Sequence, residues 1–272
     1  MITATIGFFD GVHRGHRFLI QEVDEVITFR QHPAEVLSPT NKPKLLNTFE
    51  EKIELLKQIG VKDIVVLDFN KSLAQLSARE FLKILKEKYG VERLLMGYDH
   101  RFGRREEKND NNYVEIGKEI GVEVVKGKEF CVDDRKVNSS AIRELIAEGE
   151  MEVASLLLGY NYFITGKVIT GKQIGRTIGF PTANLKVNEE KFIPQRGVYE
   201  CVVREMEQGQ ELRGMINVGD TIEVNIFDFE KDLYGQTLRV EFVRRLRDEM
   251  QFGSTDELRQ QLIKDKDTIE NG

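Results

Sequence analysis

Gly7–His16 reads GFFDGVHRGH, and this stretch joins an apolar strand-like run, Thr3–Phe8, to an apparent helix over Gly15–Val23. A strand followed by a glycine-rich turn and a helix is typical of an α/β unit. The N-terminus of such a helix presents unpaired backbone N–H groups, and Gly11 and Gly15 let the backbone come close to a ligand. The stretch therefore predicts a phosphate-binding turn.

His13 and His16 are the side chains of this turn that carry chemistry, because imidazole N–H groups can donate to phosphate oxygens as charge builds during transfer. One alternative is a tight turn whose histidines only cap or pack. Another is a metal site, which would need further ligands, and the remaining histidines of the chain are His32 and His100. The flanking glycines at a strand–helix junction favour the phosphate interpretation.

The first half of the chain alternates apolar runs with helical patterns, which favours a parallel α/β sheet. Capping boxes at Thr48 and Ser77 begin two of the helices, which end at Gly60 and Gly90. The first of these helices is expected to bury the face made of Phe49, Ile53, Leu56 and Ile59. The predicted strands are Thr3–Phe8, Val26–Phe29, Ile64–Leu67, Arg93–Met96 and Val122–Val125.

The pattern changes near Leu158–Tyr162, after which apolar and polar residues alternate. Ile222–Ile226 and Leu238–Phe242 each have one apolar and one polar face, which is typical of half-buried antiparallel strands. Val198–Val203 and Leu212–Val218 are further strand candidates, and a capping box at Ser254 begins a last helix. The second half is therefore predicted to be a small β-barrel closed by a C-terminal helix.

The bulk composition is that of an ordinary globular enzyme, with 272 residues, a formal net charge of −6 and a pI of about 5.5. A chain that bound nucleic acid would normally have a basic excess, so anion binding must be local. Cys131 and Cys201 are far apart and predict reduced thiols. We find neither an apolar run long enough to span a membrane nor a signal peptide, and we expect a cytoplasmic protein without membrane contact.

Five motifs in order along the chain resemble those of one family, the prokaryotic bifunctional riboflavin kinase/FMN adenylyltransferases (FAD synthetases). They are Gly7–His16, Thr28–Pro33 (TFRQHP), Gly97–Gly103 (GYDHRFG), Val137–Arg143 (VNSSAIR) and Gly175–Asn184 (GRTIGFPTAN). The resemblance implies a Rossmann-like α/β nucleotidyltransferase domain over residues 1–158. It implies a small antiparallel β-barrel riboflavin kinase domain with a C-terminal helix over residues 159–272.

For the first domain, the resemblance implies an ATP site and an adjoining flavin site. Ser139 and Ser140 begin a helix, and Arg143 lies one turn further on, so the three can face one anion. The implied ATP-binding residues are Gly7, Phe8, Phe9, Gly11, His13, His16, Ser139, Ser140 and Arg143, with His13 and His16 as the catalytic pair. The implied flavin-binding residues are His32, Pro33 and Asp99.

For the second domain, the resemblance implies that Thr182 and Asn184 hold Mg²⁺ together with the phosphates of ATP. They lie two residues apart in an extended segment and so face the same way, and neutral oxygen ligands suit this cation. The alternative is a glycine-rich hairpin with an ordinary turn at Pro181. The other implied ATP-binding residues are Gly171, Lys172, Gly175 and Arg176.

The kinase reaction needs a base for the attacking hydroxyl of riboflavin, and a carboxylate is the usual choice. The resemblance assigns this role to Glu223, which precedes the motif Asp232–Gly235 (DLYG). An arbitrary glutamate on a strand would instead be a solvated surface residue. Arg247 and Phe252 resemble the segment that lines the flavin ring in the second domain.

Two connections are shorter than the family pattern, one between the first helix and Val26, the other at Gly219–Thr221. The leading hypothesis is a bifunctional enzyme that makes FMN and then FAD, and two alternatives are held against it, the first motivated by the short connection before Val26. One is a riboflavin kinase with a silent first domain, and the other is a non-catalytic flavin-binding regulator. In each case we expect small-molecule ligands and neither nucleic acid nor an obligate protein partner.

Overall fold

The computed structural model describes residues 1–38, 40, 42–98, 100–103, 112–171, 174–205, 210–229 and 231–272. The side chains of residues 174, 176 and 205 are also outside this description. The chain divides into two compact units, Met1–Ser139 and Ser140–Gly272. Each unit has its own sheet and its own buried core, and each is described separately.

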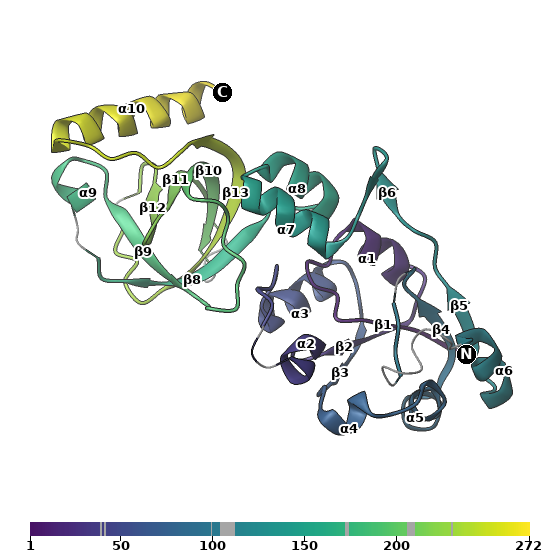
Figure 1. The fold of residues 1–272 in the computed structure, drawn as a ribbon. Coiled ribbons are helices and arrows are strands. Elements are labelled where there is room, and N and C mark those ends of the chain that lie inside the picture. Colours follow the sequence, from purple (N-terminus) through teal and green to yellow (C-terminus); the bar gives the residue numbers. More distant parts are fainter. Residues whose placement is uncertain are drawn as a thin grey trace. The chain divides into compact units, whose positions relative to one another are not determined.

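The first unit is built on a five-stranded parallel sheet, which confirms the predicted sheet (Figure 1). Its strand order is β3-β2-β1-β4-β5. The order reverses between β1 and β4, and ligands of such sheets bind at the carboxyl edge beside that point. The Gly7–His16 turn leaves the sheet at this position. The strands are β1 (Ile2–Ile6), β2 (Glu25–Phe29), β3 (Asp63–Leu67), β4 (Val91–Met96) and β5 (Glu123–Lys126), with β6 (Cys131–Val132) and β7 (Arg135–Lys136) forming a separate hairpin.

The helices of this unit begin where the predicted caps are. The capping boxes at Thr48 and Ser77 are both formed, and Gly90 ends its helix in the left-handed conformation. The crossover from β1 to β2 runs through a seven-residue helix, and the Asp24 carboxylate accepts from the Thr3 amide (2.9 Å) directly before β2. The helices are α1 (Arg14–Ile20), α2 (Pro33–Leu37), α3 (Phe49–Gln58), α4 (Lys71–Ala74), α5 (Ala78–Tyr89) and α6 (Tyr113–Ile120).

The buried face of α3 differs from the expected one. Its buried residues are Glu51, Lys52, Leu55 and Leu56, whereas Ile53 is only partly buried. Only Leu56 is common to the expected and the observed face. The helix is turned so that the Lys52 amine reaches two main-chain carbonyls, that of Phe8 in the turn after β1 and that of Phe29 at the end of β2. An apolar side chain could not satisfy them.

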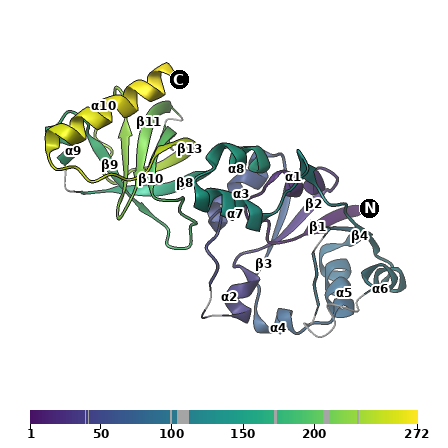
Figure 2. The same cartoon turned by 45° about the horizontal axis from the view of Figure 1, so that its top comes forward.

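The second unit contains a closed barrel with the strand order β10-β11-β12-β9-β8-β13, which confirms the predicted barrel (Figure 2). Its polar faces are less exposed than the alternation suggests, because Arg239 (8% exposed) and Glu241 (7%) form a buried ion pair in which Nε lies 3.0 Å from Oε1. The strands are β8 (Phe163–Ile169), β9 (Thr182–Val187), β10 (Gly197–Glu205), β11 (Glu211–Val218), β12 (Ile222–Ile226) and β13 (Thr237–Arg247).

Helices surround this barrel on more than one side. The last helix, α10 (Thr255–Asn271), lies along the barrel in both views, and Ser254 caps it through the Glu257 amide. The expected capping box is only half formed, because the Glu257 carboxylate accepts from Gly253 rather than from Ser254. The other helices are α7 (Ser139–Glu148), which begins at the last residue of the first unit, α8 (Met151–Leu158) and the short α9 (Ile174–Thr177).

Gly117 in α6 gives a test of this packing. A Cβ at this position would lie 2.5 Å from the Val122 carbonyl oxygen and 2.5 Å from Val124 Cγ2. Alanine normally stabilises a helix interior relative to glycine, yet here overpacking should make Gly117→Ala destabilising by about 1–3 kcal/mol. Urea unfolding of the full chain followed by circular dichroism measures this, with Lys118→Ala as the exposed neighbouring control. A gain in stability for Gly117→Ala would contradict the packing.

Candidate active sites

The turn after β1 has a backbone that few residues adopt. Phe9 (φ 56°) and Val12 (φ 36°) lie in the left-handed region together with Gly11 (φ 86°). A β-branched residue such as valine is strained there, and strain of this kind persists where the surroundings impose it, typically at functional sites. Phe9 and Val12 are both buried, so the core holds the turn in this shape.

Asp10 is the side chain that anchors the turn. It is 5% exposed, and its Oδ1 accepts from the amides of Leu46 (2.9 Å) and Asn47 (3.3 Å), which come just before α3. Its main-chain carbonyl accepts from the hydroxyl of Ser139 (2.8 Å), the first residue of α7. Sequence reasoning gave Asp10 no role, because an aspartate inside a glycine-rich turn reads as an ordinary turn residue.

His13 and His16 lie together beyond this anchor. Their rings stack with centroids 3.5 Å apart, and His13 Nδ1 accepts from the His16 amide (3.2 Å), so Nε2 carries the proton of a neutral His13. Burial lowers the pKa of His13 to about 3. Burial lowers the pKa of His16 well below its usual value as well, and the charges of His13, His100 and Lys52 act in the same direction. Both rings are therefore neutral hydrogen-bond donors at neutral pH.

One ring nitrogen of His16 has no protein partner among the described residues, since its buried Nδ1 makes no hydrogen bond. A polar atom left this way is one that a bound ligand can satisfy. Ser140 follows Ser139 in α7, and Arg143 lies one turn from Ser139 along the same helix. This is the arrangement that the sequence predicted within α7.

An apolar cavity of about 530 Å³ opens beside the same sheet. The volume and the lining suit a flat aromatic ligand. His32 caps α2 through Nδ1, which accepts from the Ala34 amide (3.1 Å), and its ring packs edge-on against Phe8. Among the predicted flavin residues, Pro33 lines the cavity and Asp99 lies outside the described residues. The other lining residues include Phe29, Leu37, Phe69, Phe81, His100 and Phe102.

Sequence reasoning did not find this cavity. Its aromatic side chains come from β2, from the segment after β3, from α5 and from the segment after β4. Each of them alone reads as part of an ordinary hydrophobic core. No periodic pattern connects residues from four separate segments, so only the fold brings them together.

In the barrel, the glycine-rich segment approaches strand β9 closely. A Cβ at Gly171 would overlap the carboxamide of Asn184, and one at Gly175 would lie 3.3 Å from the Thr182 hydroxyl oxygen and overlap the Phe180 carbonyl. Only glycine therefore allows the segment to close on Thr182 and Asn184. The predicted Lys172 lies outside the described residues, and so does the side chain of Arg176.

Glu223 lies on β12 between two asparagines of the neighbouring strands. It is paired in register with Asn184 of β9 and with Asn217 of β11, and paired residues of adjacent strands point to the same face. The Thr221 hydroxyl donates to its Oε1 (2.9 Å). The carboxylate therefore belongs to the same polar patch as Asn184, about 5 Å away between Cβ atoms.

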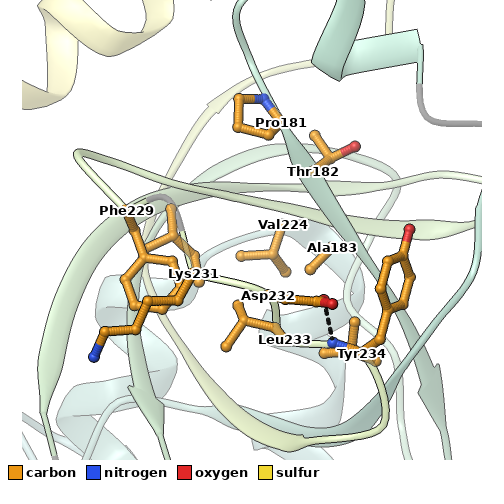
Figure 3. Close-up of a pocket in the computed structure, with 11 residues that line it drawn as sticks. Pro181, Thr182, Ala183, Val224, Phe229, Lys231, Asp232, Leu233 and Tyr234 are labelled. Carbon is orange, nitrogen blue, oxygen red and sulfur yellow. Dashed lines mark hydrogen bonds between the residues drawn. The ribbon is translucent and has the colours of Figure 1, made fainter.

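A small pocket of about 90 Å³ adjoins Thr182. Figure 3 shows Phe229 and Lys231 on one side of it and Tyr234 on the other, with the Asp232 carboxylate accepting from the Tyr234 amide (3.0 Å). The Asp232–Gly235 motif therefore faces the Pro-Thr-Ala-Asn motif across a cavity. Sequence reasoning had not assigned Phe229 or Lys231 to a site.

Arg247, predicted to contact flavin, forms a bidentate ion pair at the end of β13. Its Nε and Nη2 donate to Asp265 of α10, with a shortest distance of 2.7 Å, and the two side chains are 16% and 5% exposed. Gln261 donates to the same carboxylate (2.8 Å). The guanidinium is thus fixed in the plane of the ion pair, and Phe252 follows as a partly buried side chain.

The two units together define an enzyme class. One unit has a strained, imidazole-bearing turn at the switch point of a parallel sheet, and the other has a barrel that joins a neutral oxygen pair to a carboxylate. Each of these arrangements has the polar groups that phosphate chemistry requires. Among the residues that the structure describes, no group of three or more His, Cys, Asp or Glu side chains could hold a metal ion. None of the helices described there is both long and apolar enough to cross a membrane.

Comparison with known proteins gives the particular family. Residues 1–141 match the family model for FAD synthetase, and residues 158–271 match the one for riboflavin kinase. The chain is 36% identical to the bifunctional riboflavin kinase/FMN adenylyltransferase of Haemophilus influenzae (97% of this chain, 92% of the relative) and 34% identical to that of Bacillus subtilis (96% and 89%). The chain belongs to the family of bifunctional riboflavin kinase/FMN adenylyltransferases.

A solved structure from Streptococcus pneumoniae, described as a macrolide-efflux protein, has the same fold. It is 32% identical with a TM-score of 0.89, and the match covers 100% of this chain and 94% of that one. The alignments to the two enzymes run over 284 and 291 positions, more than the 272 residues here, so these relatives carry residues without a counterpart.

Because both family models match, the chain is an enzyme with two activities. It is a riboflavin kinase, which makes FMN from riboflavin and ATP, and an FMN adenylyltransferase, which makes FAD from FMN and ATP. The matches favour neither a silent first domain nor a non-catalytic regulator.

Substitution of Asp265 tests whether its ion pair with Arg247 stabilises the barrel unit. Removing one partner of a buried ion pair leaves the other charge uncompensated, so Asp265→Ala should lower the unfolding free energy by about 3–5 kcal/mol. Asp267→Ala, an exposed position on the same helix, is the matched control. Urea unfolding compares the two variants, and equal effects would show that the Arg247–Asp265 pair does not hold α10 on the barrel.

Proposed function

We propose that the two activities use two separate sites, with the kinase reaction in the barrel and adenylyl transfer at the turn after β1. The observation that carries this proposal is the pairing of Glu223 with Asn184 across β12 and β9, because it puts a base beside a cation ligand. The register leaves no freedom for these two residues to separate while the barrel is closed.

In the kinase reaction the terminal ribityl hydroxyl of riboflavin attacks the γ-phosphorus of ATP. A new P–O bond forms, the bond to the β-phosphate oxygen breaks, and ADP leaves with its electron pair. Glu223 accepts the proton of the attacking hydroxyl. The hydrogen bond from Thr221 orients the carboxylate for this task.

Mg²⁺ is the cation that fits Thr182 and Asn184. A hydroxyl and an amide oxygen are neutral hard ligands, and the close packing of Gly171 against Asn184 brings the backbone of the glycine-rich segment to the same place. When bound, the cation would neutralise charge on the transferred phosphoryl group. Gly171 and Gly175, with Lys172 and Arg176, are proposed to line the ATP site.

Flavin binding in the barrel is proposed for Arg247 and Phe252. The ion pair with Asp265 restricts the rotation of the guanidinium, so its flat face can stack on an isoalloxazine ring without a large loss of side-chain entropy on binding. An aromatic side chain five residues further along would add a second flat surface.

In adenylyl transfer a phosphate oxygen of FMN attacks the α-phosphorus of ATP, and pyrophosphate leaves. The attacking group is already an anion, so this step needs charge stabilisation rather than a base. His13 and His16, neutral and buried, would donate hydrogen bonds to the phosphate oxygens. Gly7, Phe8, Phe9 and Gly11 would supply the backbone of the same site.

The remaining groups of this site are proposed for the leaving group and for the flavin. Ser139, Ser140 and Arg143 would hold the pyrophosphate part of ATP, since a guanidinium binds phosphate oxygens in pairs. The apolar cavity that Pro33 lines would take the flavin ring, with His32 and Asp99 beside it. Ligand sites of this kind usually have apolar walls and a few polar groups that orient the ligand.

We place the boundary between the two activities at residue 158, where the match to riboflavin kinase begins. Riboflavin, FMN and ATP are then the partners of the chain, without nucleic acid or an obligate protein. A net charge of −6 supports this for nucleic acid. The free thiols Cys131 and Cys201 support a cytoplasmic location.

Glu223→Gln should lower kcat for FMN formation by about 10²–10⁴-fold, which is the usual contribution of a general base. FAD formation from supplied FMN should be unchanged in the same protein, because the other unit is intact. Chromatography of riboflavin, FMN and FAD after incubation with MgATP measures both. Glu190→Gln, an exposed carboxylate of the barrel unit, is the control, and normal FMN production by Glu223→Gln would remove Glu223 from the mechanism.

His16→Ala is the reciprocal test. Loss of one preorganised donor should reduce FAD formation from FMN by about 10²–10³-fold while riboflavin phosphorylation stays normal. Because the imidazole is already neutral, this loss should be the same at pH 6.5 and pH 8.5. A loss confined to low pH would instead mean that a charged His16 is the active form.

A further inference from the structure

Lys52 is a buried lysine to which neither proposed mechanism assigns a role. It lies in the first turn and a half of α3 and is 1% exposed. Its Nζ donates to the main-chain carbonyls of Phe8 (3.1 Å) and Phe29 (2.7 Å). A lysine is almost never buried this completely without a specific task, because the loss of hydration of its charge is costly.

The two carbonyls belong to the two halves of the adenylyltransferase site. Phe8 is in the turn that leads to His13 and His16, and its carbonyl also accepts from the Thr28 hydroxyl (3.2 Å). Phe29 is the last residue of β2 and lines the apolar cavity. A single amine therefore connects the phosphate turn to the wall of the flavin cavity.

The charge of this amine is balanced by few groups. Its Nζ lies 3.9 Å from the Phe8 ring centroid and 5.5 Å from that of Phe49. Burial lowers the pKa of Lys52 to about 7, and the Asp10 carboxylate opposes this shift. The neighbouring Glu51 carboxylate is engaged by the Thr48 amide (2.9 Å). The His16 imidazole is close as well, but it is neutral at neutral pH because its pKa is lowered. The Arg30 guanidinium, a permanent cation, lies over the Phe49 ring (4.6 Å).

We propose that Lys52 is a positioning residue for adenylyl transfer: it holds the phosphate turn against the flavin cavity and carries the buried positive charge beneath the bound triphosphate. The inference rests on the proposed adenylyltransferase site. The positive charge of that site then comes from the buried Lys52 amine, because His13 and His16 are neutral.

The proposal has a pH signature that packing alone would not give. Lys52 is charged below its pKa, so kcat/KM for ATP should fall as pH rises through about 7 in the free enzyme. The polyanion favours the charged amine, so the fall in kcat at saturating ATP should occur at higher pH. His13, with a pKa of about 3, does not titrate in this range.

Three variants of the full chain test this: Lys52→Met, Lys52→Arg and, as control, Lys57→Met at an exposed position of the same helix. FAD formation from FMN and MgATP is measured from pH 6 to 9, and FMN formation from riboflavin in the same samples reports on the unaltered barrel. Lys52→Met should lose about 100-fold in kcat/KM for ATP, the effect of misplacing reacting groups by an ångström, and should lack the fall above pH 7.

Lys52→Arg keeps its charge at every pH used, so it should retain more activity than Lys52→Met and show no fall above pH 7. This variant decides the question if Lys52→Met fails to fold. Activity of Lys52→Met equal to that of Lys57→Met, or a fall above pH 7 that persists in Lys52→Arg, would overturn the inference. If the unaltered protein made FMN but no FAD, the proposed adenylyltransferase site itself would be wrong.

Discussion

The carboxyl edge of β1 is the constraint on which the first site depends. There the chain turns through a left-handed backbone at Phe9 and Val12, and the Asp10 carboxylate fixes this turn by accepting from two amides ahead of α3. The imidazoles of His13 and His16 can stack only because the turn is held in place from below. The strain is thus balanced by hydrogen bonds that come from a distant part of the chain.

In the barrel, the site residues are positioned by the pairing register of the strands rather than by a strained backbone. Thr182 and Asn184 share one face of β9, and the pairing with β12 sets Glu223 beside them. Gly171 and Gly175 let the preceding segment approach the same face. A protein with an overall negative charge can therefore have two triphosphate sites, because the groups that bind the anion are confined to one small region in each case.

Much of this architecture could be predicted from the sequence, because local chemistry determined it. The caps at Thr48 and Ser77 and the left-handed Gly90 each depend on neighbouring residues only. The half-exposed polar face expected along β12 is not observed at Asn225, which is 5% exposed and donates to the Pro181 carbonyl (2.7 Å). The burial of Lys52 could not be predicted, since a lysine on an amphipathic helix is expected at the surface. The ion pair between Arg239 and Glu241 could not be predicted either. In the sequence these alternating charges indicate a solvent-exposed strand face, and only the closed barrel buries them.

The central claim is that one chain holds two complete and separate triphosphate sites. Isothermal titration of the full-length protein with Mg²⁺ and a non-hydrolysable ATP analogue tests it most directly. The account predicts that two molecules of the analogue bind per chain, and that His16→Ala weakens one binding event while leaving the other unchanged. Binding of one molecule per chain, or equal weakening of both events, would contradict it.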